Sequence, residues 1–132
     1  MKTFKILTII GIISFAFYSF TTLVQEEWKV PAKYQTMKNP IAAKTDAAIG
    51  KSLYTKHCKS CHGAEGYGDG PKADGLKGDL GDFSSAAYQK QSDGALFYKT
   101  TIGRADMPEF AKKIASDEDR WLIVNYMRTL AE

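Results

Sequence analysis

The two cysteines of the chain lie three residues apart, and a histidine directly follows the second one. The run reads His57-Cys58-Lys59-Ser60-Cys61-His62. Two thiols at this spacing stand on one turn of chain, where each can add to one vinyl group of a porphyrin while His62 binds the iron from below. The pattern therefore predicts one haem c per chain, attached covalently through Cys58 and Cys61, with His62 as an axial iron ligand.

Other uses of this cluster are less well supported. A thioredoxin-like dithiol requires a βαβ context, and nothing upstream has the pattern of a strand. A structural zinc site needs four ligands, whereas the chain has two Cys and two His in a single cluster. A plain disulfide would not supply a core. His57 is too close to Cys58 to reach the opposite haem face, and we expect it to face solvent.

The second axial ligand decides the function, and Met107 is the best candidate. Met37 falls in a linker, and Met127 lies in an amphipathic helix, where methionine usually fills the core. Met107 follows His62 by 45 residues, enough chain to reach the other haem face, and Pro108 fixes the backbone after it. A His/Met pair closes both axial positions and raises the reduction potential. We therefore expect one-electron transfer and no enzymatic activity.

The segment that carries these residues is poor in aliphatic side chains. Only 14 of the 87 residues in 46–132 are Ile, Leu, Val or Phe, and seven glycines fall between Gly63 and Gly81. A domain this small and this poor in aliphatic residues normally needs a disulfide, a metal or a large bound group. A covalent haem would complete the core, so we expect the domain to fold poorly without it.

Charge is divided unequally along the chain. Residues 46–132 carry 12 basic and 13 acidic residues, so their net charge is −1, and residues 1–45 carry the +4 that brings the whole chain to +3. Two propionates and a ferric porphyrin core would bring the domain to about −2. Nucleic-acid binding is therefore disfavoured, as is a strongly basic docking face. We expect the lysines to be scattered and solvated. The alternative is a local basic patch, made of either Lys51, Lys56 and Lys59 or Lys99, Lys112 and Lys113.

Residues 1–24 form a hydrophobic leader with only two charges, Lys2 and Lys5. As a helix, the uncharged run over 6–25 would be about 30 Å long, enough to cross a bilayer. A basic start before an apolar run is also typical of a secretory signal peptide, but no Ala-x-Ala cleavage site follows. We favour an uncleaved anchor with a cytoplasmic N-terminus over a cleaved signal peptide. In both cases the remainder is exported.

Residues 25–45 contain two prolines and four lysines without helical or strand periodicity, which predicts an extended linker. Trp28 either lies at a membrane interface or folds back on the domain.

Helices are expected through the rest of the chain, with no run typical of a strand. Gly50 would let two helices cross closely, and Tyr54 lies one turn further on the same face. Two middle helices are expected, one over 84–91 and one from a Ser92 cap to Gly103. A last helix follows a capping box that begins at Ser116. Its apolar stripe has helical spacing: Ile123, Tyr126, Met127 and Leu130.

On these residues, segment 46–132 resembles the class I monohaem cytochromes c of the small bacterial type. Gly50 and Tyr54 match the family's first-helix glycine and aromatic, and Ile123 and Tyr126 match the last-helix pair that packs across them. The resemblance implies an all-α fold of 3–5 helices wrapped around one haem c. It also implies that Tyr54 and Phe97 pack on the haem.

The glycine-rich run over 63–71 is similar to the loop that follows the haem motif in this family. Pro71 looks like the family proline whose carbonyl accepts the ring N–H of His62, which would fix the orientation of the imidazole. A phosphate-binding loop would need a Gly-Lys-Ser/Thr ending, which is missing.

The resemblance implies an electron carrier on the periplasmic side of a bacterial inner membrane. Its partners would be redox proteins such as a quinol-oxidising complex, a terminal oxidase or a reductase. The alternative is a haem c subunit fixed in a larger respiratory complex, which an uncleaved leader favours. A haem peroxidase or gas sensor requires an open sixth site, and Met107 argues against both.

Overall fold

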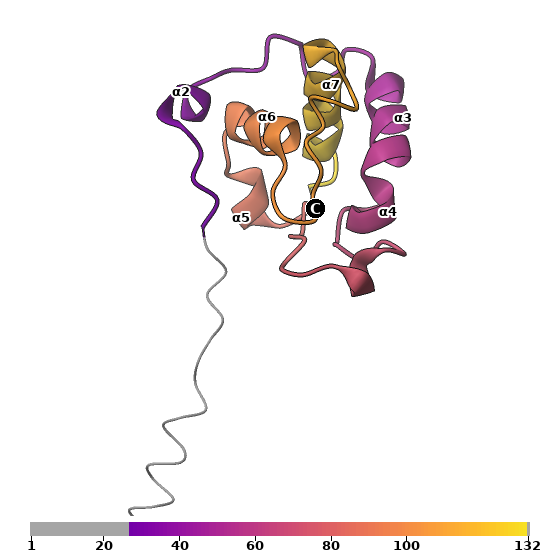
Figure 1. Ribbon diagram of the computed structural model, residues 1–132. Helices are drawn as coiled ribbons and strands as arrows, with labels where there is room; N and C mark the ends of the chain where they lie inside the picture. Colours follow the sequence, from indigo (N-terminus) through magenta and orange to yellow (C-terminus); the bar gives the residue numbers. More distant parts are fainter. Residues whose placement is uncertain (1–26, 132) are drawn as a thin grey trace, which may run out of the picture.

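Six α-helices form the part of the chain that the computed structural model describes, residues 27–131 (Figure 1). In chain order the elements are α2 (Ala32–Gln35), α3 (Ala47–His57), α4 (Lys59–His62), the 3₁₀ turn η1 (Ala73–Gly75), α5 (Ala86–Gln89), α6 (Asp93–Ile102) and α7 (Asp117–Arg128). Between residues 27 and 131 the only β pairing is an isolated bridge between Arg104 and Met107. The predicted all-α fold is confirmed. Only α3, α6 and α7 have ten or more residues.

The ends of α6 and α7 lie where their capping residues predict. The Ser92 hydroxyl accepts a hydrogen bond from the backbone N–H of Ala95 at 3.1 Å, and Gly103 ends α6 with a φ of 68°. The Ser116 hydroxyl accepts from the N–H of Asp119 at 3.2 Å. Each bond satisfies one N–H that the first helical turn leaves without a partner.

The helix expected over 84–91 is shorter than predicted. It covers only Ala86–Gln89, with Ser85 as its N-cap. The side chain of Asp82 accepts hydrogen bonds from both the backbone N–H and the hydroxyl of Ser84, at 2.8 and 2.7 Å. This local turn competes with the helix, as Asp and Ser side chains commonly do.

Helices α3 and α7 cross at Gly50, as the sequence predicts. A Cβ atom at Gly50 would lie 2.4 Å from the backbone oxygen of Leu122 and 3.4 Å from the Cβ of Tyr126. One turn further along α3, the rings of Tyr54 and Tyr126 lie 5.0 Å apart between centroids. The missing side chain at Gly50 therefore sets the distance between the two helices.

Residues 31–41 differ from the predicted extended linker, because they form α2 and pack on the domain. Tyr34 and Ile41 contact the hydrophobic core. The side-chain N–H of Asn39 donates to the side-chain oxygen of Asn125 on α7 at 2.8 Å. The bond between Asn39 and Asn125 joins residues 86 positions apart, so no local pattern in the linker could indicate it.

The predicted leader over residues 1–24 lies outside the described residues. No helix within 27–131 has the length and apolar character needed to cross a membrane.

Replacement of Gly50 by alanine tests the α3–α7 crossing. The added methyl meets backbone, which cannot turn away as a side chain can, so we expect Gly50→Ala to lower the free energy of unfolding by about 1–3 kcal/mol. Denaturant unfolding of the haem-loaded protein, followed by far-UV circular dichroism, measures this. Gly75→Ala is the matched control, because a Cβ there meets nothing within 4 Å. Equal stability of the two variants would contradict the crossing.

Candidate functional site

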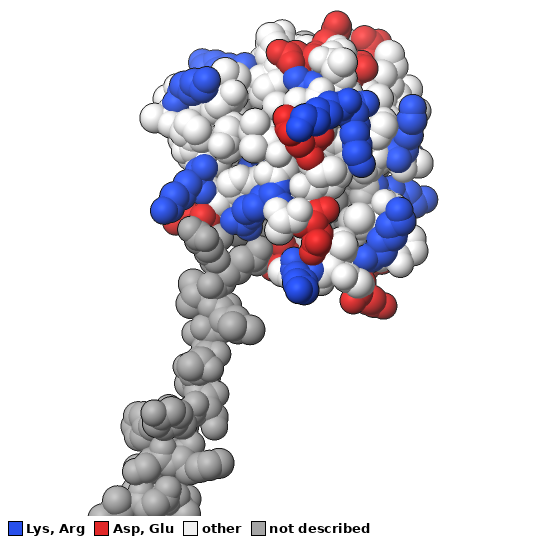
Figure 2. Space-filling model, viewed as in Figure 1, with Lys and Arg blue, Asp and Glu red and all other residues white. Residues whose placement is uncertain are grey.

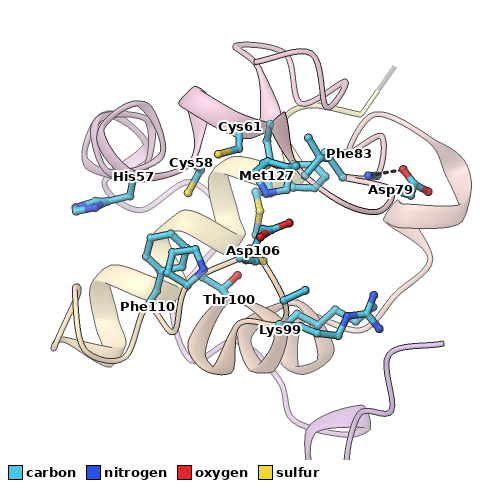
Figure 3. A pocket seen from close by; sticks show the side chains of 18 of the residues that line it. His57, Cys58, Cys61, Asp79, Phe83, Lys99, Thr100, Asp106, Phe110 and Met127 are labelled. Carbon is cyan, nitrogen blue, oxygen red and sulfur yellow. Dashed lines mark hydrogen bonds between the residues drawn. The ribbon is translucent and has the colours of Figure 1, made fainter. Parts of the chain in front are cut away.

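A cavity of about 710 Å³ lies between the Cys58–His62 turn, α6 and the loop over residues 104–110 (Figure 3). Its volume falls in the range of pockets that hold a cofactor-sized ligand. Side chains from all parts of the domain line it. Its apolar lining includes Leu76, Leu80, Phe83, Leu96, Phe110 and Met127.

Both cysteines line this cavity. Cys58 stands at the junction of α3 and α4, and the backbone N–H groups of Cys61 and His62 donate to its carbonyl at 3.1 and 3.0 Å. Both thiols are free, with Cys58 buried and Cys61 half-buried. Burial, with a smaller effect of Cys61, raises the pKa of the Cys58 thiol to about 12. Figure 3 shows the two sulfur atoms on one side of the cavity.

His62 also lines the cavity, and its surroundings favour the neutral imidazole. Burial lowers the pKa of its imidazole, against a smaller opposing effect of the Leu80 backbone. The ring of Phe83 stacks on the imidazole at 4.5 Å between centroids. Among the described residues, Nδ1 of His62 is buried without a hydrogen-bond partner. A buried imidazole that has a nitrogen without a protein partner is suited to metal binding.

Pro71 lies in a loop fastened to the turn that carries His62. On either side of it, the N–H of Gly70 donates to the carbonyl of Cys61 at 3.1 Å, and the N–H of Lys72 to that of Ser60 at 2.9 Å. A Cβ at Gly70 would lie only 2.6 Å from the Ser60 oxygen. Nδ1 of His62 has no hydrogen-bond partner among the described residues, so the bond from His62 to the Pro71 carbonyl stays a prediction for the haem-loaded protein.

Two of the three candidate methionines line the cavity. Met107 belongs to a loop that reciprocal backbone bonds between Arg104 and Met107 close, both at 2.9 Å. Met127 is buried in the core, as predicted, but it also lines the cavity, and its sulfur accepts a hydrogen bond from the Tyr88 hydroxyl at 3.2 Å. Met37 is 36% exposed and lies outside the cavity.

The structure places Tyr54 and Phe97, which we expected to pack on the haem, away from the cavity wall. Tyr54 points into the α3–α7 contact, and its hydroxyl donates to the carbonyl of Gly63 at 2.9 Å. Phe97 stacks on Trp121 at 4.0 Å between centroids, on the other side of α6. Both side chains are buried, so their apolar character was recognised correctly, but helical spacing does not tell which buried neighbour a side chain meets.

His57 also differs from its prediction. It is half-buried, lines the cavity, and lies edge-on to the ring of Phe110 at 6.2 Å between centroids. Burial, with Lys56 and Lys113, lowers the pKa of its imidazole.

Sequence reasoning missed several wall residues. Phe83, Phe110 and Tyr88 come from loops and from the short α5, where no periodicity marks a buried face. Trp28 lines the cavity from outside the predicted domain. Of the two placements left open for Trp28, the structure shows the one folded back on the domain.

Basic residues outnumber acidic ones around the cavity, although the domain as a whole is slightly acidic. The basic lining residues are Lys56, Lys72, Lys77, Lys99, Arg104 and Lys113, and the acidic ones are Glu27, Asp79 and Asp106. On the face seen in Figure 2, charges of both signs are interspersed. The excess of positive charge is therefore local to the cavity.

The family model for cytochrome c matches residues 47–131. The chain belongs to the cytochrome c family. This membership accounts for a site built from two adjacent thiols, a neutral buried imidazole and a large cavity. Cytochromes c bind haem c covalently and transfer electrons, and the thiols, the imidazole and the cavity suit that group.

Among solved structures, the cytochrome is similar to a chain of the reducing HAO-like protein complex of Kuenenia stuttgartiensis. The identity is 29% and the TM-score 0.61. The match covers 83% of this chain and 53% of that one, so the cytochrome spans about half the length of that chain. No curated protein matches it.

The hydrogen bond from the Tyr54 hydroxyl to the carbonyl of Gly63 leads to a prediction. Tyr54→Phe leaves the buried carbonyl of Gly63 without its donor, and we expect a loss of about 1–2 kcal/mol in the free energy of unfolding. The visible haem spectrum should not change, because Tyr54 does not line the cavity. Unfolding and absorption spectra of the holoprotein measure both effects. Tyr126→Phe, on the facing helix, is the control and should cost less. A spectral shift in Tyr54→Phe would contradict the assignment.

Proposed function

We propose that this cytochrome is a one-electron carrier with one haem c per chain, attached through Cys58 and Cys61 and ligated by His62 and Met107. The observation that carries the proposal is that these four side chains, brought together from two distant parts of the chain, line the same cavity. The haem iron, when bound, supplies the ferric–ferrous couple.

The residues of the chain would hold the cofactor and keep water away from it. Cys58 is the C-cap residue of α3, and Cys61 lies one turn further on in α4, which fixes their mutual position before any attachment. Burial lowers the pKa of the His62 imidazole and so favours its neutral form, the form that binds a metal. Phe83, together with the other apolar lining residues, provides a surface of low polarity. Such surroundings, like the axial ligands, adjust the potential of a bound haem.

Met107 is a better ligand candidate than Met127, although both line the cavity. The sulfur of Met127 accepts the Tyr88 hydroxyl hydrogen bond, which occupies one of its lone pairs. Met127 also lies on α7, in the packed core. Met107 stands instead in a backbone-closed loop between Arg104 and Pro108, and Gly103 makes the entry to this loop possible with a φ of 68°. The loop holds Met107 in place without committing its side chain to a helix.

Replacement of the two methionines one at a time tests the ligand. We expect Met107→Ala to abolish the weak red-end absorption of ferric haem that marks sulfur ligation and to lower the reduction potential, because a sulfur ligand favours the ferrous state. Met127→Leu is the matched control, similar in volume and placed on the same cavity, and should keep the band. Absorption spectra and redox titration of both holoproteins decide the matter. Loss of the band in Met127→Leu but not in Met107→Ala would show that Met127, and not Met107, is the ligand.

A fixed haem subunit of a larger respiratory complex is the second candidate. The observation in its favour is the similarity, at 29% identity, to a chain of a redox protein complex. In both cases we propose that the domain is exported to the periplasmic side of the inner membrane and that residues 1–24 act as its anchor.

The two candidates and the anchor can be tested together in membranes. A haem-stained pull-down of the tagged protein should recover the intact chain with the membrane fraction. For a carrier, partner subunits should be lost on washing with salt; for a fixed subunit, they should remain in constant proportion. N-terminal sequencing of the exported protein checks the anchor. A mature chain that begins between residues 20 and 28 would refute it.

A further inference from the structure

Trp28 lies at the rim of the cavity, although it precedes the residues that match the family, 47–131. Its side chain is half-buried and contacts two cations. The guanidinium carbon of Arg104 lies 4.5 Å from the centroid of the indole ring, and Nζ of Lys99 lies 5.7 Å from it. Both distances fall within the range of cation–π attraction. Trp28 thus joins α6, which carries Lys99, to the loop that carries Arg104 and Met107.

The segment that brings Trp28 to this position, the N-terminal strap (residues 27–41), is fixed to α6 at its middle. The carbonyl of Tyr34 accepts a hydrogen bond from the Ser92 hydroxyl at 3.3 Å, and the Tyr34 ring lies 4.7 Å from that of Tyr98 between centroids. Gly94 allows the close approach, since a Cβ there would lie 2.2 Å from the Tyr34 oxygen. The first turn of α6 therefore requires a glycine because the strap crosses it.

The end of the strap is fixed to α7. The side-chain N–H of Asn39 donates to the Asn125 side chain at 2.8 Å, and the Asn125 amide donates in turn to the carbonyl of Ala42 at 3.2 Å. Asn125 is buried and cannot bond to water, so this pairing gives its polar side chain the hydrogen-bond partners it needs. With attachments on both α6 and α7, the strap is an integral part of the domain.

We propose that Trp28 is a cofactor-contact residue, held by the strap against the part of the haem that faces the cavity rim. The inference rests on the proposed function, since it requires a haem in this cavity. An indole at the rim excludes water from the adjacent cofactor surface with its apolar body, while Lys99 and Arg104 over the ring keep it in place. The haem-binding unit of this chain therefore extends to residue 27.

Removal of the indole should have two effects on the bound haem. Water gains access to the cofactor surface and favours the more highly charged ferric state, so the reduction potential falls. Small reductants also reach the haem more often. Without the indole, the cation–π contacts that hold residue 28 against Lys99 and Arg104 are lost. A loss of this strength raises the fraction of molecules in which the strap is detached from the cavity rim by about fivefold, and the rate of reduction should rise by a comparable factor.

The test uses the full-length holoprotein in four forms besides the wild type. Trp28→Ala removes the indole, and Trp28→Phe restores an aromatic ring. Tyr34→Ala loosens the strap at a residue that does not line the cavity. Lys29→Ala is the control, because Lys29 is an exposed neighbour of Trp28 on the strap that does not line the cavity.

Three measurements apply to each form: the indole N–H resonance in the diamagnetic ferrous protein, the rate of reduction by a small neutral reductant, and the reduction potential. We expect the Trp28 resonance, assigned by its absence in Trp28→Phe, to be displaced by the haem ring current and to return toward its ordinary position in Tyr34→Ala. Trp28→Ala and Tyr34→Ala should be reduced severalfold faster, at lower potential, while Lys29→Ala behaves as the wild type and Trp28→Phe lies between.

Covalent haem in the wild type together with an undisplaced indole resonance, or with equal rates in Trp28→Ala and the wild type, would overturn the role of Trp28 and leave the proposed function intact. Absence of covalent haem in the wild type would overturn the proposed function itself. The alkaline pyridine spectrum of the denatured protein, which reports the thioether bonds, separates these two outcomes. Far-UV circular dichroism of Tyr34→Ala checks that its fold persists, and Trp28→Ala, at a half-exposed position, carries the test if it does not.

Discussion

A domain with few aliphatic side chains has to surround a cavity of about 710 Å³, and the rest of the structure depends on this constraint. The core proper is a single cluster that joins α3, α6 and α7. Five of its eleven buried residues are aromatic, and aromatic rings fill more volume per residue than aliphatic side chains. Cys58 and Met127 belong to the core and to the cavity wall at once. A bound haem would therefore extend this core without a boundary, which explains why so few aliphatic residues suffice.

The parts of the structure that the sequence predicts well are those fixed by local chemistry. Ser92 and Ser116 cap α6 and α7 because a hydroxyl at that position satisfies an N–H three residues later. Gly50 marks the crossing of α3 and α7 because a side chain there has no space. The cysteine spacing places both thiols on the turn that joins α3 to α4. Each of these features depends on a few neighbouring residues or on a steric requirement that one residue type meets.

The features that the sequence did not predict depend on contacts between distant residues. Tyr54 and Phe97 are buried as their spacing indicates, and the structure places them against the backbone of Gly63 and the ring of Trp121. The strap has two prolines and no periodicity, yet the Asn39 side chain donates a hydrogen bond to that of Asn125, 86 positions further along the chain. A glycine at position 94 was the available sign, because a glycine in the first turn of a helix weakens it unless another backbone must approach.

The position of the strap also relates the cavity to the part of the chain that precedes it. Glu27, the first residue that the structure describes, lines the cavity together with Trp28. Whatever precedes residue 27 is therefore attached at the cavity rim and not at the opposite end of the domain.

Six basic and three acidic side chains also line the cavity, so a redox partner would approach a locally positive surface next to this attachment point. If residues 1–24 hold the domain at a membrane, as we propose, the strap that we propose to contact the haem keeps the cavity rim close to that membrane. Anchoring and electron exchange would then share one side of the domain, and a change in the length of the strap would alter both.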